Sequence, residues 1–274
     1  MTRRRFLRFA AVMGAAGVGG ASVARAAPRT VRLTRHRVPW DGDDAFRVVH
    51  LTDLHLGWAT PPALVEQALR LCRSAAPDLV VMTGDYLNLT LRYLPDLHRL
   101  LAAVPAPCLA TLGNHDHRAG AAAIVSAFDE HGIRVLQNAS HRLRVGGRGL
   151  TVVGIDDGFS RHADVARSLA SLSRPEAALV LTHFPETASE VASRGGRLVL
   201  SGHTHGGQVT VPVVTKAILR LAGSKYVAGW YSIGSTRLYV NAGVGSAAIR
   251  CRLGERAAPE VALIELVPRR RNAR

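Results

Sequence analysis

Apolar runs and amphipathic segments alternate along the first half of the chain. Three short runs are typical of buried strands, and they are Phe46 to Leu51, Asp78 to Thr83 and Cys108 to Leu112. Apolar residues at helical spacing follow each run, which predicts helices over Pro62 to Arg73, Leu91 to Val104 and Ala119 to Glu130. Strands and helices that alternate in this order are joined by right-handed crossovers, so we expect a largely parallel sheet.

The second half of the chain is richer in strands. Two runs, Arg142 to Val145 and Leu150 to Ile155, flank a glycine-rich stretch and predict a hairpin. Further strands are expected at Ala178 to Thr182, Leu198 to Ser201, Gln208 to Val211, Thr236 to Asn241, Ala247 to Arg252 and Val261 to Val267. Two sheets packed face to face accommodate this order, so we expect one domain over residues 30–268 and a basic tail over residues 269–274.

The first 26 residues have a different pattern, which is that of an export signal. Residues 2–8, TRRRFLR, resemble the twin-arginine consensus. A weakly apolar run follows, too short to span a membrane, and Ala24-Arg25-Ala26 offers the small residues of a cleavage site. We therefore expect transport by the twin-arginine translocase and cleavage after Ala26, with a retained anchor as the alternative. The protein would then act in the periplasm, the cell wall or on the outer face of the cytoplasmic membrane.

Charge and composition narrow the range of partners. The formal net charge of the chain is +15, which favours phosphorylated substrates, wall polymers or acidic lipids. Aromatic residues make up 5% of the chain and no nucleic-acid-binding motif is present, so we expect no nucleic acid partner. The three cysteines, Cys72, Cys108 and Cys251, match no zinc spacing, and their odd number argues against a disulfide framework.

Residues able to bind metal ions recur directly after the apolar runs. They form five blocks, which are Asp53-Leu54-His55, Gly84-Asp85, Gly113-Asn114-His115-Asp116, Thr182-His183 and Gly202-His203-Thr204-His205. Ligand sites in α/β sheets lie at the carboxyl ends of strands, so the blocks are expected to meet. Carboxylate, imidazole and amide oxygen donors suit Mn, Fe, Zn or Ni, and no block contains a cysteine.

The order of these blocks resembles the pattern of the calcineurin-like metallophosphoesterases, D-x-H, G-D, G-N-H-D/E, H and G-H-x-H. The segments around His205 and Asn241 are similar to those of an exported, YkuE/YaeI-like bacterial branch of that superfamily. The resemblance implies an α/β fold, a four-layer α/β/β/α sandwich of two packed mixed sheets flanked by helices. It also implies a hydrolase that cleaves phosphodiesters, and monoesters as a second activity.

The resemblance further implies a role for each residue of the blocks. Two divalent ions would be bound, one by Asp53, His55 and His205 and the other by Asn114, His183 and His203. Asp85 would bridge them, and a metal-bridging hydroxide would attack phosphorus in line. His115 would neutralise the developing charge or protonate the leaving oxygen, and Asp116 would orient His115. Arg250 is a further candidate for contact with phosphate.

Two other branches of the superfamily fit the sequence less well. Purple acid phosphatases carry a tyrosine three residues after the bridging aspartate, where this chain has Asn88. The protein Ser/Thr phosphatase sequence G-D-x-V-D-R-G is replaced here by Gly-Asp-Tyr-Leu-Asn-Leu-Thr. Neither a ferric–tyrosinate centre nor a protein phosphatase is therefore expected.

Two functional alternatives stay open. One is a pyrophosphatase acting on a lipid-linked nucleotide sugar of the UDP-diacylglucosamine type, although the export signal argues against a cytoplasmic substrate. The other is an inactive metal- or wall-binding scaffold, although no ligand is missing from the blocks. The basic and apolar segment Pro212 to Tyr231 is expected at the rim of the site. There it would position a lipid- or wall-linked substrate or contact an anionic membrane, unless it is an ordinary packed helix and loop.

Overall fold

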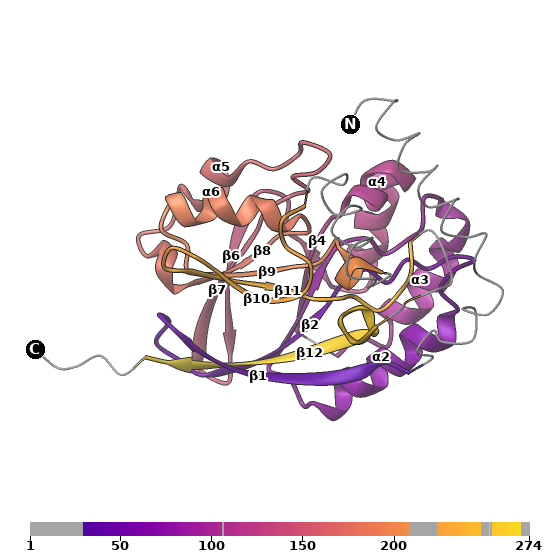
Figure 1. The fold of residues 1–274 in the computed structure, drawn as a ribbon, viewed down its shortest axis with the longest axis horizontal. Helices are drawn as coiled ribbons and strands as arrows, with labels where there is room; N and C mark the ends of the chain where they lie inside the picture. The colour runs from indigo at the N-terminus through magenta and orange to yellow at the C-terminus, as the bar shows by residue number, and fades with distance from the viewer. Residues whose placement is uncertain (1–29, 106, 209–223, 248–251, 253, 270–274) are drawn as a thin grey trace, which may run out of the picture.

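The structure is a computed structural model that describes residues 30–105, 107–208, 224–247, 252 and 254–269. Two six-stranded sheets pack face to face within these residues (Figure 1). The first sheet has the order β1 (Arg32–Trp40), β12 (Glu260–Pro268), β2 (Phe46–Leu51), β3 (Leu79–Thr83), β4 (Cys108–Thr111) and β5 (Arg134–Val135). The second has the order β10 (Gly229–Ile233), β11 (Thr236–Val240), β9 (Leu198–Ser201), β8 (Ala178–Leu181), β7 (Arg148–Gly154) and β6 (Ala139–Val145).

Both sheets are mixed, because parallel strands form their centres. Strands β2 to β5 are mutually parallel, as are β7, β8, β9 and β11. Antiparallel pairs join β12 to β2 in the first sheet, and β6 to β7 and β10 to β11 in the second. The central parallel strands therefore direct their carboxyl ends toward the same edge of the sandwich, which is where the polar blocks follow.

Helices cover the outer face of each sheet (Figure 1). On the first sheet lie α2 (Pro62–Ser74), α3 (Leu94–Leu101) and α4 (Asn114–Glu130), and on the second lie α5 (Val165–Leu169) and α6 (Ala188–Ser193). Helix α2 shows the reason, since Val65, Ala68, Leu69 and Cys72 share one face and are buried. A third apolar core lies between the sheets. The predicted four-layer α/β/β/α sandwich is confirmed.

Several predicted elements change their limits in the structure. The helix predicted from Ala119 begins at Asn114, so it includes the third polar block. The helix predicted from Leu91 is divided into a 3-10 turn (Leu91–Tyr93) and α3. Gln208 closes a 3-10 turn (His205–Gly207) rather than beginning a strand, and residues 209–211 lie outside the described residues. Of the strand expected over Ala247 to Arg252, residues 248–251 are also outside them.

Three edge strands, β1, β5 and β10, are absent from the prediction. In β1 the exposed arginines mask the alternation, and only Val38 and Trp40 near its end are buried. Cys72 and Cys108 are buried free thiols, while Cys251 lies outside the described residues. No helix in the described part of the chain has the length and apolarity needed to cross a membrane. The predicted export signal, residues 1–26, and the basic tail after Arg269 lie outside that part.

Candidate metal centre

The five polar blocks meet at the carboxyl ends of the central strands. Asp53 and His55 follow β2, Asp85 follows β3, and Asn114 and His115 follow β4 in the first turn of α4. His183 follows β8, and His203 and His205 follow β9 in the second sheet. The side chains of Asp53, His55 and His183 are wholly inaccessible to solvent. Residues from both sheets thus form one buried polar cluster at the edge of the sandwich.

Asp53, His55 and His205 form one group of converging donors. The Nε2 atoms of His55 and His205 face each other at 3.0 Å, and Asp53 Oδ1 lies 3.3 Å from His205 Nε2 and 3.7 Å from His55 Nε2. Thr52 Oγ1 donates to Asp53 Oδ2 at 2.7 Å, which fixes the carboxylate. Two imidazole nitrogens and one carboxylate oxygen therefore surround a single point.

Asp85, His183 and His203 form a second group. His203 Nδ1 and His183 Nε2 are 3.2 Å apart, and Asp85 Oδ2 lies 3.2 Å from His183 Nε2. His183 donates from Nδ1 to the Thr83 carbonyl at 2.7 Å, which leaves Nε2 as the ring atom that faces the group. The same Asp85 oxygen lies 3.3 Å from His55 Nε2. Asp85 therefore stands between the two groups.

The protonation states of the facing rings show that this cluster suits a cation. Despite burial, hydrogen bonds to Asp53 and Asp85 raise the pKa of His55 to about 9, and Asp85 raises the pKa of His183 well above its ordinary value. Burial lowers the pKa of His203 to about 4 and that of His205 well below its ordinary value. In each facing pair one ring thus favours the charged form and the other the neutral form, at the place where a divalent ion would put its charge.

Asn114 adds an amide oxygen to this donor set. Its Oδ1 atom is buried and has no hydrogen-bond partner among the described residues. A buried acceptor without a partner costs free energy unless a ligand or water satisfies it. Imidazole, carboxylate and amide oxygen donors together suit Mn, Fe, Zn or Ni. The residues present therefore fit metal ions.

The backbone of the blocks is strained where it presents these side chains. Asp53, His55, Asp85, His203 and His205 all have positive φ angles, between 43° and 77°. Non-glycine residues rarely adopt this region, and such strain gathers at functional sites because the surrounding structure enforces it. Close packing at the glycines of the blocks helps to hold these residues at positive φ angles. A Cβ atom at residue 113 would lie 2.3 Å from Asp85 Oδ1, and one at residue 202 would lie 2.2 Å from Asp53 Oδ2.

His115 lies beside the two groups, with its ring edge-to-face against His55 at 4.6 Å between centroids. Its Nδ1 atom is buried without a hydrogen-bond partner among the described residues. Burial lowers the pKa of His115 to about 4, so the ring is neutral at pH 7. With Asp85 and His55 it also forms a third set of donors close enough to hold an ion.

Asp116 has partners that differ from the expected one. Its carboxylate accepts the backbone N–H groups of Gly113, Asp85 and Tyr86 at 2.7–2.9 Å, and it does not meet Nδ1 of His115. Burial and the Asp85 charge raise the pKa of Asp116 to about 7, which the N–H donors oppose. Asp116 therefore ties the Asp85 turn to the start of α4.

Arg252 is a site neighbour that the sequence interpretation did not identify. It is buried, and its guanidinium contacts His205 Nδ1 at 2.9 Å and the carbonyls of Ala242, Gly245 and Ala257. The predicted phosphate contact Arg250 lies outside the described residues. Nothing in the local sequence separates the two arginines, because only the fold brings residue 252 behind His205.

Residues 156–162 border the second group and were also missed. Phe159 packs against His203 with ring centroids 5.0 Å apart. His117 contacts Asp156 Oδ1 at 2.7 Å and stacks on His162. The Thr204 hydroxyl donates to the Val227 carbonyl, so the described end of the predicted rim segment lies beside the last block. Residues 212–223 of that segment lie outside the described residues.

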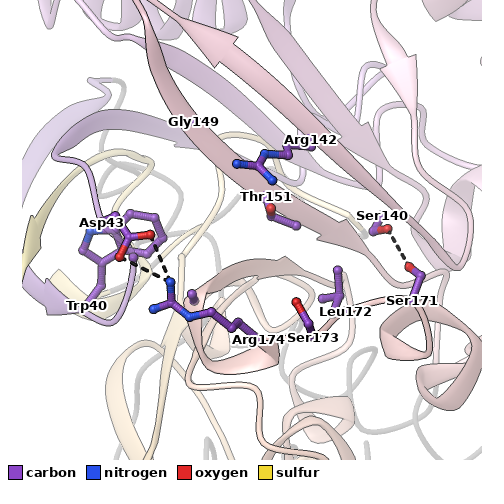
Figure 2. Close-up of a pocket in the computed structure, with 12 residues that line it drawn as sticks. Trp40, Asp43, Ser140, Arg142, Gly149, Thr151, Ser171, Leu172, Ser173 and Arg174 are labelled. Atoms are coloured by element: carbon purple, nitrogen blue, oxygen red, sulfur yellow. Dashed lines mark hydrogen bonds and ion pairs between the residues drawn. The ribbon is translucent and has the colours of Figure 1, made fainter.

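A separate hollow lies at the other end of the second sheet. Its volume is about 320 Å³, and its lining includes Ser140, Arg142 and Thr151 on β6 and β7 and Arg174 before β8 (Figure 2). Arg174 contacts Asp43 at 3.0 Å across its mouth. Ala177 directly precedes the amino end of β8, and Thr151 of β7 pairs with Ala178, the first residue of β8, whereas the metal-binding blocks follow carboxyl ends. The hollow is therefore distinct from the polar cluster.

The fold and the buried donor cluster define a metal-dependent hydrolase of phosphoesters. The calcineurin-like phosphoesterase family matches residues 46–207, and the chain belongs to that family. It is 32% identical to phosphodiesterase YaeI of Escherichia coli over 97% of this chain and 100% of the relative. It is 30% identical to the uncharacterized metallophosphoesterase YkuE of Bacillus subtilis over 97% and 98% of the two chains.

A third relative carries a more specific name. The chain is 26% identical to the UDP-2,3-diacylglucosamine pyrophosphatase LpxG of Chlamydia trachomatis, over 80% of this chain and 84% of the relative. The superfamily and the YkuE/YaeI-like branch expected from the sequence are confirmed by the family match and the first two relatives.

Proposed function

We propose that this protein is a two-metal phosphodiesterase of the cell envelope. The observation that carries the proposal is the position of Asp85, whose Oδ2 atom lies within 3.3 Å of ring nitrogens from both donor groups. One ion would be held by Asp53, His55 and His205, and the other by Asn114, His183 and His203, with Asp85 shared. The ions would supply neutralisation of the phosphoryl oxygens and a nucleophilic water at neutral pH.

The protein's own residues would orient the diester and handle its charge. His115 is neutral at pH 7, so it would donate an N–H hydrogen bond to a phosphoryl or leaving oxygen. An anionic phosphodiester beside the ring would raise its pKa, so the ring would take up a second proton and, as imidazolium, pass it to the leaving oxygen as that oxygen gains charge. Asp116 would act as a positioning residue, because it holds the Asp85 turn through three backbone N–H groups.

The proposed location rests on the sequence of residues 1–26. Export by the twin-arginine translocase would place the enzyme in the periplasm, the cell wall or on the outer face of the cytoplasmic membrane. The substrate would then be a phosphodiester of the envelope. Expression of the full chain, followed by fractionation and N-terminal sequencing, tests this location. Full-length protein that stays in the cytoplasm would contradict it.

A pyrophosphatase acting on a lipid-linked nucleotide sugar is the second candidate, supported by the similarity to LpxG. The same donor set can serve a pyrophosphate bond, since both reactions place charge on phosphoryl oxygens. Incubation with UDP-2,3-diacylglucosamine and chromatography of the products separates the two. Release of UMP at a higher kcat/KM than that of simple diesters would favour the second candidate.

The main experiment measures metal content and turnover together. The purified chain is stripped with a chelator, reloaded with Mn, Zn, Fe or Ni, and assayed on bis-p-nitrophenyl phosphate and p-nitrophenyl phosphate. We expect two ions per chain by elemental analysis, with diester turnover that depends on them. Full turnover after stripping, or one ion at saturation, would contradict the two-metal proposal.

A further inference from the structure

Exposed apolar side chains gather beside the metal centre. Among the described residues, the large hydrophobic side chains with high exposure are Trp58 (53%), Leu89 (47%) and Leu91 (36%). Trp58 lies three positions after His55, and Leu89 lies four positions after Asp85. Clustered exposed apolar groups next to a site mark an interaction surface rather than chance exposure.

The two loops that carry these side chains are held together. Leu56 pairs with Leu87 in a parallel bridge, and the Asn88 N–H donates to the Leu56 carbonyl at 3.0 Å. A Cβ atom added at Gly57 would lie 3.0 Å from Asn88 Cβ, so Trp58 and Leu89 each directly follow one member of a closely packed pair. We call Trp58, Leu89 and Leu91 the apolar rim.

The rim continues onto the helix that carries His115. The Leu91 side chain packs against Gly120 of α4, where a Cβ atom would lie 3.1 Å from Leu91 Cδ1. The Thr90 hydroxyl accepts the Arg92 N–H and caps the short turn that presents Leu91. The rim is therefore a fixed surface joined to the catalytic loops.

Leu89 is held outward at a conformational cost. Its φ angle is +63°, a region that a bulky side chain rarely adopts and that glycine or asparagine adopts readily. A leucine at this position gains little from the fold, because about half of its surface stays exposed. An exposed and strained leucine is typical of a residue kept for contact with a partner.

Cationic side chains flank the rim. Arg92 follows Leu91 directly, Arg118 lies on α4 three residues after His115, and both are exposed. Tryptophan and leucine beside arginine are the composition of surfaces that bind at the interface of anionic bilayers. Each basic residue near such a surface adds attraction for its head groups.

We propose that the apolar rim, with Arg92 and Arg118, docks this protein on the surface of a lipid bilayer that contains anionic lipids. Because the rim borders the donor cluster, docking brings the centre to the level of the lipid head groups. One consequence rests on the proposed function: the phosphodiesters that the enzyme hydrolyses would be parts of lipids. The docking itself is independent of catalysis.

Two measurements on the full chain test the docking. Sedimentation with vesicles of phosphatidylcholine, with and without phosphatidylglycerol, measures partition. Quenching of tryptophan fluorescence by brominated lipids reports whether Trp58 enters the interface. We expect partition to require phosphatidylglycerol and quenching to fall to baseline in Trp58→Phe. Quenching that is unchanged in Trp58→Phe would overturn the proposal, even if another part of the chain binds vesicles.

Two variants separate docking from folding. Leu89→Asn should reduce partition about fivefold, since roughly half a leucine side chain is no longer buried in lipid, while thermal stability is maintained because asparagine tolerates φ of +63°. Arg92→Glu should reduce partition about thirtyfold. Its matched control Arg37→Glu, on the exposed face of β1, should change partition less than threefold. Equal effects of the two charge reversals would overturn the proposal.

The remaining outcomes identify which idea fails. If the wild-type protein turns over bis-p-nitrophenyl phosphate but does not bind vesicles, the docking is wrong and the proposed function stands. If it binds vesicles through the rim but turns over no diester, the proposed function is wrong and the docking stands. A dimer in sedimentation velocity that becomes monomeric in Leu89→Asn would assign the rim to a second copy of this chain instead.

Discussion

The two ends of the second sheet place charged side chains in opposite surroundings. At the carboxyl ends of β8 and β9, His183 and His205 are buried and face other donors at 3.0–3.2 Å. At the amino ends, Arg174 and Asp43 line a hollow with 37% and 68% of their side chains exposed (Figure 2). Strand β8 therefore leads from a hydrated ion pair near its start to a buried cluster after its end.

The difference shows which end is suited to a cation. Arg174 and Asp43 neutralise each other and remain hydrated, so their pairing costs little and contributes little. In the buried cluster two carboxylates and four imidazoles face one another with too few protons to give every lone pair a hydrogen bond. Each lone pair left without a partner costs free energy, because burial removes water from it. A bound divalent ion removes that cost, which is why the carboxyl ends hold the chemistry.

The largest expected effect is the difference in activity between two variants, each of which removes an aspartate from one end of the sandwich. Asp85→Ala should abolish metal-dependent diester turnover, because both donor groups lose their shared carboxylate. Asp43→Ala, at the hollow, should leave kcat/KM within twofold of wild type. Steady-state kinetics with Mn, together with elemental analysis, check both. Comparable losses in the two variants would break the comparison.

The next effect belongs to His115. His115→Ala should retain both ions but lower kcat by about 10²–10⁴-fold, the range expected for a positioned proton donor. Elemental analysis and single-turnover kinetics on the diester distinguish binding from chemistry. Loss of an ion from this variant would instead make His115 a ligand, consistent with its closeness to His55 and Asp85.

A smaller effect is expected on the stability of the fold at acid pH, through the buried residue His50. Burial lowers the pKa of His50 to about 3. Its neutral form therefore gives stability that is complete above the ordinary pKa of about 6.5 and is lost as pH falls toward about 3. His50→Gln should reduce the slope of unfolding free energy in this window by at most about 1.4 kcal/mol per pH unit.

Urea unfolding between pH 7.5 and 4 in the presence of chelator measures that slope. The wild-type protein, measured in parallel, gives the reference slope. An unchanged slope in His50→Gln would show that the acid sensitivity arises elsewhere.

The smallest effect is expected at the exposed pair of the hollow. Arg174→Ala should lower the free energy of unfolding by no more than about 1 kcal/mol, because the ion pair with Asp43 is hydrated. Chemical denaturation at low and high salt checks the value. A loss of unfolding free energy well above this value would mean that the ion pair at the hollow also stabilises the fold substantially.

Much of the fold could be predicted from the sequence because local burial leaves a local pattern. Strands β2, β3 and β4 are apolar runs, and α2 repeats apolar residues at helical spacing. The edge strands β1, β5 and β10 were missed, since solvent on one side weakens that pattern and β5 has only 2 residues. The start of α4 was placed too late, because its first turn carries the polar residues of the site.

The sequence by itself determined the chemistry of the centre, since its donors follow strands and a parallel sheet directs strand ends to one edge. Only the tertiary structure decided which residues contact or surround the metal-binding side chains. Asp116 holds the Asp85 turn, Arg252 lies behind His205, and the apolar rim stands beside the cluster. Such contacts join residues up to about 50 positions apart or carried by different loops. They depend on strand order and register across two sheets, which no local periodicity records.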